Sequence, residues 1–356
     1  MVVNRQFWEN KKILVTGHTG FKGSWLSLWL QMMEAKVVGY SLPPPTKPNL
    51  FEIARVAENM ISVIGDIRDL EALQSFIKSQ RPEIIIHMAA QSLVRYGYEN
   101  PIETYSTNVM GTVNVLEAVR KTKTVKVVLI VTSDKCYENK EWIWGYREGD
   151  PIGGNDPYSS SKGCAELVTS AYRSSYFSGE NKDHNVTIAS VRAGNVIGGG
   201  DWAEDRLIPD IIKAVMEHRT VLIRNPQAIR PWQYVLDPLH GYLLLAERLW
   251  NYGHEYTGGW NFGPSDEDAK PVSWIINNIK QIWGDDVSWE LDNKEHPKES
   301  FFLKLDCSKA RSKLGWKQKL SLEETLVRTV RWYRNYILNK DMRDYTEKEI
   351  SNYEMF

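Results

Sequence analysis

The chain has 356 residues, enough for one large domain or for two smaller ones that each bury a core. Its 44 Lys and Arg balance 45 Asp and Glu, which gives no electrostatic reason to expect binding to nucleic acid or to an anionic membrane. The N-terminus lacks a signal-peptide pattern, and no apolar run approaches the ~20 residues that span a bilayer. The three cysteines suit neither a disulfide framework nor a zinc site. We therefore expect a cytoplasmic protein.

Short apolar segments alternate with helix-like segments through the first half of the chain. Between the expected strands lie expected helices at 25–34, 69–80 and 108–121. Continuous apolar strands separated by amphipathic helices predict an α/β fold, a doubly wound parallel sheet of the Rossmann type. Such sheets bind ligands beyond the carboxyl ends of their strands. The expected strands are 12–17, 36–42, 61–67, 83–90, 125–133 and 186–192.

The alternation of apolar and helix-like segments becomes less regular after about residue 193. A Gly-rich loop, RAGNVIGGGDW, comes first, and residues 224–234 are typical of turns and an edge strand. Helices are expected at 205–218 and 321–338. We predict a smaller, less regular region that covers the sheet and supplies contacts to a substrate.

The segment TGHTGFKG (16–23) follows the first expected strand and opens a helix. Its glycines, Gly17, Gly20 and Gly23, lie three residues apart. One glycine permits a tight turn, another lets the backbone approach a pyrophosphate, and a third lets the helix pack on the strand. A glycine triplet could be a purely structural turn, but this strand–loop–helix setting at the start of the chain favours dinucleotide binding.

The segment PYSSSKG places Tyr158 and Lys162 four residues apart. On a helix these positions share a face, so the ammonium can lie beside the phenol. A nearby cation lowers the pKa of a phenol, normally near ~10, and makes Tyr158 a plausible base for an alcohol that loses a hydride. The alternative, two unrelated surface side chains, is less consistent with a nucleotide-binding fold.

The segment VTSDKCY (131–137) ends an almost wholly apolar run with Ser133, Asp134 and Lys135. Charged side chains are rarely buried without partners. Neighbouring residues on a strand point to opposite faces, so Asp134 and Lys135 can reach one substrate only if the strand has already turned. The alternative is a surface Asp-Lys pair at the end of a strand.

The glycine segment matches the T-G-x-x-G-x-x-G form of the extended short-chain dehydrogenases/reductases, and GDIRD (65–69) and HMAAQ (87–91) also resemble segments of that family. The resemblance implies that Ser133, Tyr158 and Lys162 are catalytic. It implies that Asp66 contacts the adenine, although a helix N-cap is the alternative for this residue. The implied cofactor residues are Gly17, Thr19, Gly20, Phe21, Gly23, Asp66, Ile67, Ala89, Ala90, Asn108, Tyr158 and Lys162, with Asn108 more scaffold than chemistry.

The second expected strand ends VVGYSLPPP, without an Asp or Glu for a ribose 2′-hydroxyl. Nor is a basic residue well placed for a 2′-phosphate, because Lys47 lies beyond three prolines. The residues alone therefore leave NAD and NADP open, and NAD is implied by the resemblance.

The Asp134-Lys135 pair, together with WGYREGDPIGGNDPYSSSKG (144–163) and RPWQYVLDPL (230–239), closely resembles the CDP-glucose 4,6-dehydratases. The resemblance runs from residue 12 to about 335. It implies oxidation at C4 of the sugar, with Tyr158 taking the hydroxyl proton, then elimination of water across C5 and C6 and return of the hydride to C6. The product would be a 4-keto-6-deoxy sugar nucleotide, a precursor of deoxysugars in surface polysaccharide such as O-antigen.

Two questions stay open at this stage. Asp134 is the acid and Lys135 the base by analogy with the family, yet a neighbouring Lys would favour an ionised Asp, which allows the reverse. Another sugar-nucleotide 4,6-dehydratase or a 4-epimerase of the same fold is the alternative function, although epimerisation needs no acid–base pair at C5 and C6. A dinucleotide-sensing protein without catalysis would not need Ser133, Tyr158 and Lys162 together.

The change in pattern predicts a division into two domains, and the resemblance implies a set of substrate contacts. An NAD-binding Rossmann domain is expected at 1–192 and about 228–255, and a nucleotide-sugar-binding domain at about 193–227 and 256–356. CDP-glucose is the expected small-molecule substrate of a homo-oligomer, dimer or tetramer, without nucleic acid, membrane or metal as a partner. The expected substrate-binding residues are Gln91, Ser92, Asn195, Arg230, Tyr234 and His296. A loop-capping role is the alternative for Asn195, and a surface position is the alternative for His296.

Overall fold

A computed structural model of the chain describes residues 1–178, 185–284, 287–294 and 302–356. Its centre is a seven-stranded parallel sheet with the strand order β10-β6-β5-β4-β1-β2-β3. The first six of these strands in chain order confirm the six strands expected from apolar runs. Their bounds are β1 (Lys12–Thr16), β2 (Lys36–Ser41), β3 (Ile61–Ile64), β4 (Ile84–His87), β5 (Val127–Val131), β6 (Thr187–Ala193) and β10 (Gly258–Phe262).

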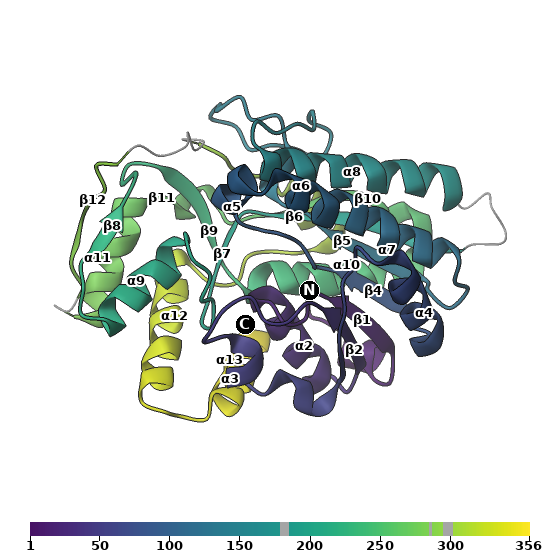
Figure 1. Cartoon of the computed structure of the whole chain (residues 1–356), viewed down its shortest axis with the longest axis horizontal. Coiled ribbons are helices and arrows are strands. Elements are labelled where there is room, and N and C mark those ends of the chain that lie inside the picture. The colour runs from purple at the N-terminus through teal and green to yellow at the C-terminus, as the bar shows by residue number, and fades with distance from the viewer. Residues whose placement is uncertain (179–184, 285–286, 295–301) are drawn as a thin grey trace.

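Helices cover both faces of this sheet, which is why its central strands are apolar on both sides (Figure 1). One apolar cluster joins β1, β4 and β5 to α4, α7 and α8, and a second, larger cluster joins the opposite face to α2 and α10. The expected helices at 25–34, 69–80 and 108–121 are thereby confirmed. The bounds are α2 (Phe21–Met32), α4 (Leu70–Gln80), α7 (Gly111–Arg120), α8 (Pro157–Tyr176) and α10 (Leu236–Tyr252).

A smaller region lies beside the carboxyl ends of the strands, at the left of Figure 1. It contains a three-stranded sheet in the order β11-β9-β7 and a two-stranded sheet of β12 and β8. Its helices include the two expected at 205–218 and 321–338. The bounds are β7 (Asn195–Ile197), α9 (Leu207–Met216), β8 (Val221–Ile223), β9 (Ile229–Tyr234), β11 (Ala269–Pro271), α11 (Val272–Trp283), β12 (Trp289–Leu291) and α12 (Leu322–Ile337).

The expectation of an edge strand at 224–234 is wrong, because β9 is the middle strand of its sheet. Proline normally confines a strand to an edge because it lacks an N–H. Here β7 pairs only with the stretch of β9 from Trp232 to Tyr234. Pro231 lies outside that stretch, so its missing N–H interrupts no bond of that ladder.

Two segments of the range 256–356 lie with the large sheet and not with the smaller region. β10 is the seventh strand and pairs with β6 along its whole length. The C-terminal helix α13 (Met342–Glu354) packs against α2, and Glu354 accepts a hydrogen bond from the indole of Trp29. The predicted division into domains is otherwise untested and stays a prediction.

Within the described residues, no helix has both the length and the apolar character that a membrane crossing requires.

Short helices complete the described structure. The short helices are α1 (Arg5–Trp8), α3 (Leu50–Ile53), η1 (Val56–Asn59), α5 (Val94–Glu99), α6 (Pro101–Tyr105), η2 (Ser106–Met110), η3 (Asp134–Cys136), η4 (Gly253–Tyr256), η5 (Asp266–Asp268) and η6 (Ala310–Leu314).

The strand register brings the loops that follow β1, β4, β5 and β6 to one edge of the sheet. Thr16 pairs with His87, His87 with Ile130, and Val131 with Val191. All of these strands are parallel, so the residues that follow them meet at the same edge. The sequence segments that suggested chemistry therefore converge in space.

Candidate active site

A cavity of about 810 Å³ lies at this edge, between the large sheet and the smaller region. Loops after β1, β4 and β5 form one side, and β7, β9 and the start of α9 contribute to the other. Most of the expected site residues line it. They are Gly17, Thr19, Gly20, Phe21, Gly23, Asp66, Ile67, Ala89, Ala90, Ser92, Ser133, Asp134, Lys135, Tyr158, Lys162, Asn195 and Arg230.

The three glycines of the first loop occupy positions with different steric limits. Gly17 has φ +74°, and a Cβ there would lie 2.7 Å from the backbone nitrogen of Ala89, so the loop can approach β4 only without a side chain. A Cβ on Gly23 would lie 2.1 Å from the carbonyl oxygen of Gly17. At Gly20 the nearest atom would be 3.4 Å away, which is ordinary contact, so the space beside it belongs to the cavity. The loop thus has the shape of a pyrophosphate-binding site at the start of α2.

The loop is also tied to the end of β2. The Thr19 hydroxyl lies 2.8 Å from the hydroxyl of Ser41 and donates to the carbonyl oxygen of Leu42 at 2.9 Å. Thr19 is buried, so it fixes the loop in addition to lining the cavity.

Asp66 lines the cavity and pairs with Arg68, whose Nη2 lies 2.6 Å from its carboxylate. Although partial burial opposes ionisation, the hydrogen bonds from Arg68 hold the pKa of Asp66 below its usual value. Asp66 is not the N-cap of α4, which was its alternative role. The N-cap is Asp69, which accepts a hydrogen bond from the backbone of Ala72.

Sequence reasoning missed Lys22, which follows Phe21 in the glycine loop and lines the cavity. Its ammonium donates to the Tyr242 hydroxyl at 3.1 Å. Burial, with the neighbouring charges of Lys162 and Arg206, lowers the pKa of Lys22 to about 7. The signal in the sequence was a lysine inside a glycine-rich loop, where small or apolar residues suffice for the turn.

The strand has turned before it reaches the charged pair. β5 ends at Val131, Ser133 caps the short helix η3, and Asp134 and Lys135 both lie on the cavity wall. The Ser133 hydroxyl donates to the Asp134 carboxyl at 2.8 Å. The condition set by the sequence, that both charged side chains can face one ligand, is therefore met.

Asp134 and Lys135 differ in their exposure. Asp134 is only 3% exposed, whereas Lys135 is partly exposed. Burial raises the pKa of Asp134 above its ordinary value, although Lys135, the Ser133 hydroxyl and Arg230 act in the opposite direction. Desolvation thus outweighs the neighbouring cations, so the Asp134 carboxyl is protonated more readily than a solvent-exposed one.

Tyr158 and Lys162 lie on α8 and both line the cavity. Burial raises the pKa of Tyr158 to about 12, despite an opposing hydrogen bond with Ser133. Burial also lowers the pKa of Lys162 to about 8, and its ammonium donates to the carbonyl oxygen of Val131 at 3.4 Å. The expected lowering of the Tyr158 pKa by Lys162 is therefore wrong for this structure, because desolvation of both groups is the larger effect.

Helix α8 is fixed at its start and at its centre. Asp156 caps the helix by accepting a hydrogen bond from the backbone of Ser159 at 2.9 Å. One turn beyond Lys162, the buried Glu166 pairs with Arg192 on β6 at 2.8 Å and accepts a hydrogen bond from the Thr132 hydroxyl at 2.5 Å. This network joins α8 to the ends of β5 and β6 near Ser133.

Cations gather where the cavity enters the smaller region. Arg206, just before α9, pairs with Asp201 at 3.0 Å and donates to the Ser92 hydroxyl at 3.0 Å. Arg230 on β9 lines the same wall and donates to the carbonyl oxygen of Ile229. Arg206 is a second residue that sequence reasoning missed, since an arginine before a helix carries no distinctive pattern.

Three expected site residues do not line the cavity. Gln91 turns its side chain to Thr104 and to the backbone of Leu93. Asn108 donates to the Gln91 carbonyl oxygen and to the Ser161 hydroxyl, so it holds the loop after β4 against α8 and acts as scaffold. Tyr234 is buried with its hydroxyl 3.4 Å from the Glu349 carboxylate on α13, because β9 turns that face toward the core. His296 lies outside the described residues.

The arrangement can be compared with known proteins. Residues 14–329 match the family model described as GDP-mannose 4,6 dehydratase. The chain belongs to this family. A CDP-glucose 4,6-dehydratase of Salmonella typhimurium is 58% identical over 353 residues, which cover 99% of this chain and 98% of that protein.

Solved structures of this dehydratase family and its neighbours share the fold. A dTDP-glucose 4,6-dehydratase from Bacillus anthracis in complex with NAD has a TM-score of 0.74 and 25% identity, covering 91% of this chain and 97% of that one. A UDP-glucose 4-epimerase from Thermotoga maritima with UDP-glucose has a TM-score of 0.78 and 23% identity, covering 92% and 99%. The predicted family and the predicted Rossmann-type fold are both confirmed. Among the described residues, no three His, Cys, Asp or Glu side chains group as metal ligands.

Proposed function

We infer that this protein is a CDP-glucose 4,6-dehydratase that uses NAD. The observation that carries the inference is the Asp134-Lys135 pair, which lies on one cavity wall with Ser133, Tyr158 and Lys162. The Salmonella typhimurium relative, similar along nearly the whole chain, bears the same name. We further propose that the protein works in the cytoplasm and that its product supplies deoxysugars for surface polysaccharide.

The dinucleotide would lie along the loops after β1, β3 and β4. The backbone amides from Gly20 to Lys22 at the start of α2 would face the pyrophosphate, and Asp66 would lie at the adenine end. When bound, NAD accepts a hydride from C4 of the sugar and later returns it to C6.

The first proton transfer is assigned to Tyr158. Its phenol would take the proton of the C4 hydroxyl, while Ser133 would hold that hydroxyl by a hydrogen bond. Because burial raises the pKa of Tyr158 to about 12, the phenolate needs positive charge beside it. Lys162, one helical turn away on the same face of α8, is placed to supply that charge.

The elimination is assigned to Asp134 and Lys135. Asp134, whose buried carboxyl favours the protonated form, would give its proton to the departing C6 hydroxyl. Lys135, which is less buried, would take the proton from C5. The raised pKa of Asp134 supports this assignment over its reverse.

The substrate diphosphate would lie where the cavity passes Arg206 and Arg230. Both guanidinium groups lie on the cavity wall, and guanidinium binds phosphate oxygens through paired hydrogen bonds. Asn195 on β7 and Ser92 after β4 would contact the sugar from opposite sides of the cavity.

The direct test is incubation of the purified protein with CDP-glucose and NAD. We expect a 4-keto-6-deoxy product, visible by its absorbance in alkali and by the loss of one water in the mass spectrum. Tyr158→Phe should reduce turnover by roughly 10²–10⁴-fold, because a positioned acid–base group contributes about that much. Parallel reactions with dTDP-, GDP- and UDP-glucose separate this function from the related dehydratases. Absence of product from CDP-glucose would refute the proposal.

Two glycine variants should separate cofactor binding from folding. Gly20→Ala has room for its Cβ, so it should fold normally, yet that Cβ would stand where the pyrophosphate approaches. We expect NAD affinity to fall at least roughly tenfold, about 1.4 kcal/mol. Gly23→Ala places its Cβ 2.1 Å from the Gly17 carbonyl oxygen and should destabilise the fold by roughly 1–3 kcal/mol. Thermal denaturation and calorimetric titration with NAD measure the two effects; equal behaviour of the two variants would contradict the assignment.

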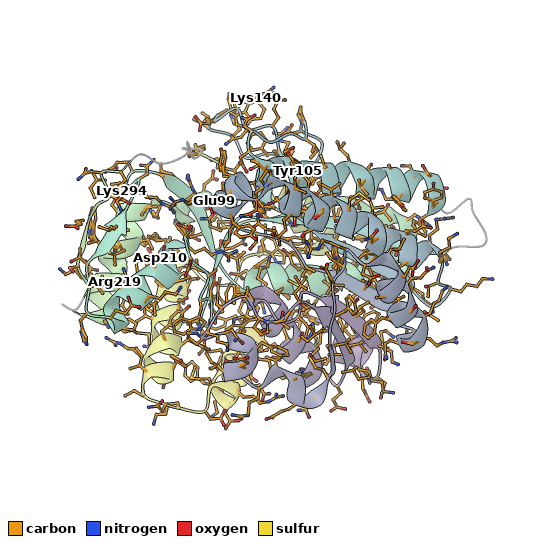
Figure 2. The ribbon with its side chains drawn as sticks, viewed as in Figure 1. Glu99, Tyr105, Lys140, Asp210, Arg219 and Lys294 are labelled. Carbon is orange, nitrogen blue, oxygen red and sulfur yellow. The ribbon has the colours of Figure 1, made fainter. Side chains whose placement is uncertain are left out.

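We also propose that the protein forms a homodimer through α6, η2 and α8. Ile102 is 85% exposed, and Met110 and Tyr105 lie on the same continuous helical stretch. Leu167 on the neighbouring α8 is 59% exposed. Figures 1 and 2 show α6, α8 and Tyr105 at one face of the molecule. Adjacent exposed apolar side chains are typical of a surface that a second copy covers.

Removing this apolar character should produce monomers. We expect Ile102→Glu combined with Leu167→Glu to halve the mass measured by light scattering, because a charge on each helix would oppose association. Leu338→Glu is the matched control, since Leu338 is 67% exposed at the end of α12. An unchanged mass in the double variant, or a monomeric unsubstituted protein, would contradict the proposed interface.

A further inference from the structure

The far end of the cavity, in the smaller region, holds a carboxylate that the mechanism does not use. Asp210 lies on α9 and lines the cavity together with Leu222 from β8, Arg224 after it and Val272 from α11. Figure 2 labels Asp210 on α9, with Arg219 farther toward the rim of the same region. Leu222 and Val272 are apolar, whereas Asp205 and Arg224 are charged.

The carboxylate of Asp210 feels the charges of Lys213, Arg224 and Arg219 but is bonded to none of them within the described residues. It makes no hydrogen bond or ion pair there, whereas the adjacent Asp205 pairs with Arg95 at 2.8 Å and with Arg224 at 3.4 Å. Partial burial, with the charge of Asp205, raises the pKa of Asp210 to about 6. A half-buried carboxylate that faces a cavity and accepts no hydrogen bond from the protein loses its water when a ligand enters. The free-energy cost of this desolvation is recovered only if the ligand donates a hydrogen bond to the carboxylate.

The position of Asp210 relative to the diphosphate site indicates which part of a ligand reaches it. Arg206, just before α9, and Asp210 in its first turn are four residues apart and both line the cavity, about 6 Å apart along the helix axis. The hexose end of the cavity lies on the other side of Arg206, beside Ser92 and Tyr158. A nucleotide sugar with its diphosphate at Arg206 therefore extends its base toward Asp210.

We propose that Asp210 selects the base of the substrate by accepting a hydrogen bond from the exocyclic amine of cytosine. This inference rests on the proposed function and deepens it. An ionised carboxylate can only accept, and the amine at position 4 of cytosine is a donor. Uracil and thymine carry a carbonyl oxygen at the same position, so the two acceptors would repel one another. Discrimination by such a contact is typically about 1–3 kcal/mol, roughly 5–150-fold.

The test compares kcat/KM for CDP-glucose and UDP-glucose in the unsubstituted protein and in Asp210→Asn. An amide can donate to a carbonyl oxygen as well as accept from an amine, so it removes the repulsion. We expect the CDP/UDP ratio to fall at least about tenfold in Asp210→Asn. The ratio is independent of the fraction of folded enzyme, because both substrates are measured on one preparation. Dissociation constants of CDP and UDP, determined by calorimetry with NAD present, should shift in the same direction.

The matched control is Glu217→Gln, which removes one negative charge just after α9 at an exposed position. It should leave the ratio unchanged. A ratio unchanged in Asp210→Asn, or an equal loss with both substrates, would overturn the role of Asp210. If the unsubstituted protein does not prefer CDP-glucose, the proposed function itself fails, so the two failures are distinguishable.

Discussion

Lys135→Met should still oxidise C4 of the substrate but should not eliminate water. The side chain proposed to take the C5 proton is absent in this variant, while Ser133, Tyr158 and Lys162 remain in place. We expect the reduced nicotinamide to accumulate with the ketone, visible by near-ultraviolet absorbance, and exchange of the C5 proton with deuterated solvent to disappear. Formation of the 4-keto-6-deoxy product should fall by roughly 10²–10⁴-fold.

The matched variant Asp134→Asn distinguishes the two members of the pair. If the buried Asp134 gives its proton to the C6 hydroxyl, this variant retains exchange at C5 and loses elimination. Loss of exchange in Asp134→Asn, with exchange retained in Lys135→Met, would establish the reverse assignment. Lys140→Met is the control, because Lys140 is half exposed at the outer edge of the molecule in Figure 2 and should leave both steps unchanged.

Glu166→Ala should destabilise the protein by about 3–5 kcal/mol, because it leaves the Arg192 guanidinium buried without its counter-charge. Both side chains are 5% exposed and joined by two hydrogen bonds of 2.8 and 2.9 Å. The same change removes the acceptor of the Thr132 and Ser190 hydroxyls. Denaturation with urea measures the loss of unfolding free energy.

A less buried ion pair of the same type provides the control. Glu117 on α7 pairs with Arg120 at 2.7 Å, and both side chains are partly exposed to solvent, so Glu117→Ala should cost less than about 1 kcal/mol. Equal losses for Glu117→Ala and Glu166→Ala would contradict the importance of the buried network.

The effect of pH on this pair has a defined sign. Although burial works against ionisation, hydrogen bonds from Arg192 and the two hydroxyls lower the pKa of Glu166 below its ordinary value. The stabilisation is therefore present above the ordinary carboxyl pKa and is lost as the pH falls through the lower pKa of the folded protein.

Sequence patterns predicted six of the seven strands of the large sheet, because its central strands are buried on both faces and form uninterrupted apolar runs. Three segments were identified because their chemistry requires residues at a fixed spacing. They are the glycine loop, the segment with Tyr158 and Lys162, and the residues after β5. They converge in space because parallel strands present their carboxyl ends at one edge.

Other features depend on contacts between distant segments and have no local pattern. Residues 224–234 were expected to form an edge strand, but β9 pairs with β11 on one side and with β7 on the other. Tyr234 was expected at the substrate, but the packing of α13, more than a hundred residues later, places its hydroxyl beside Glu349. The pKa of Tyr158 was misjudged because the spacing to Lys162 is visible in the sequence whereas the burial of both groups is not.

The path of the chain between β6 and β7 joins the two sheets beside Asp134. β6 ends at Ala193 in the large sheet and β7 begins at Asn195 in the small one, with only Gly194 between them. A Cβ on Gly194 would lie 3.1 Å from the Asp134 carboxylate, so this junction passes directly beside the proposed acid–base pair. A linker of one residue keeps the facing ends of β6 and β7 within a few ångströms of one another. The spacing between the proposed acid and the start of the small sheet is therefore set by the covalent chain itself.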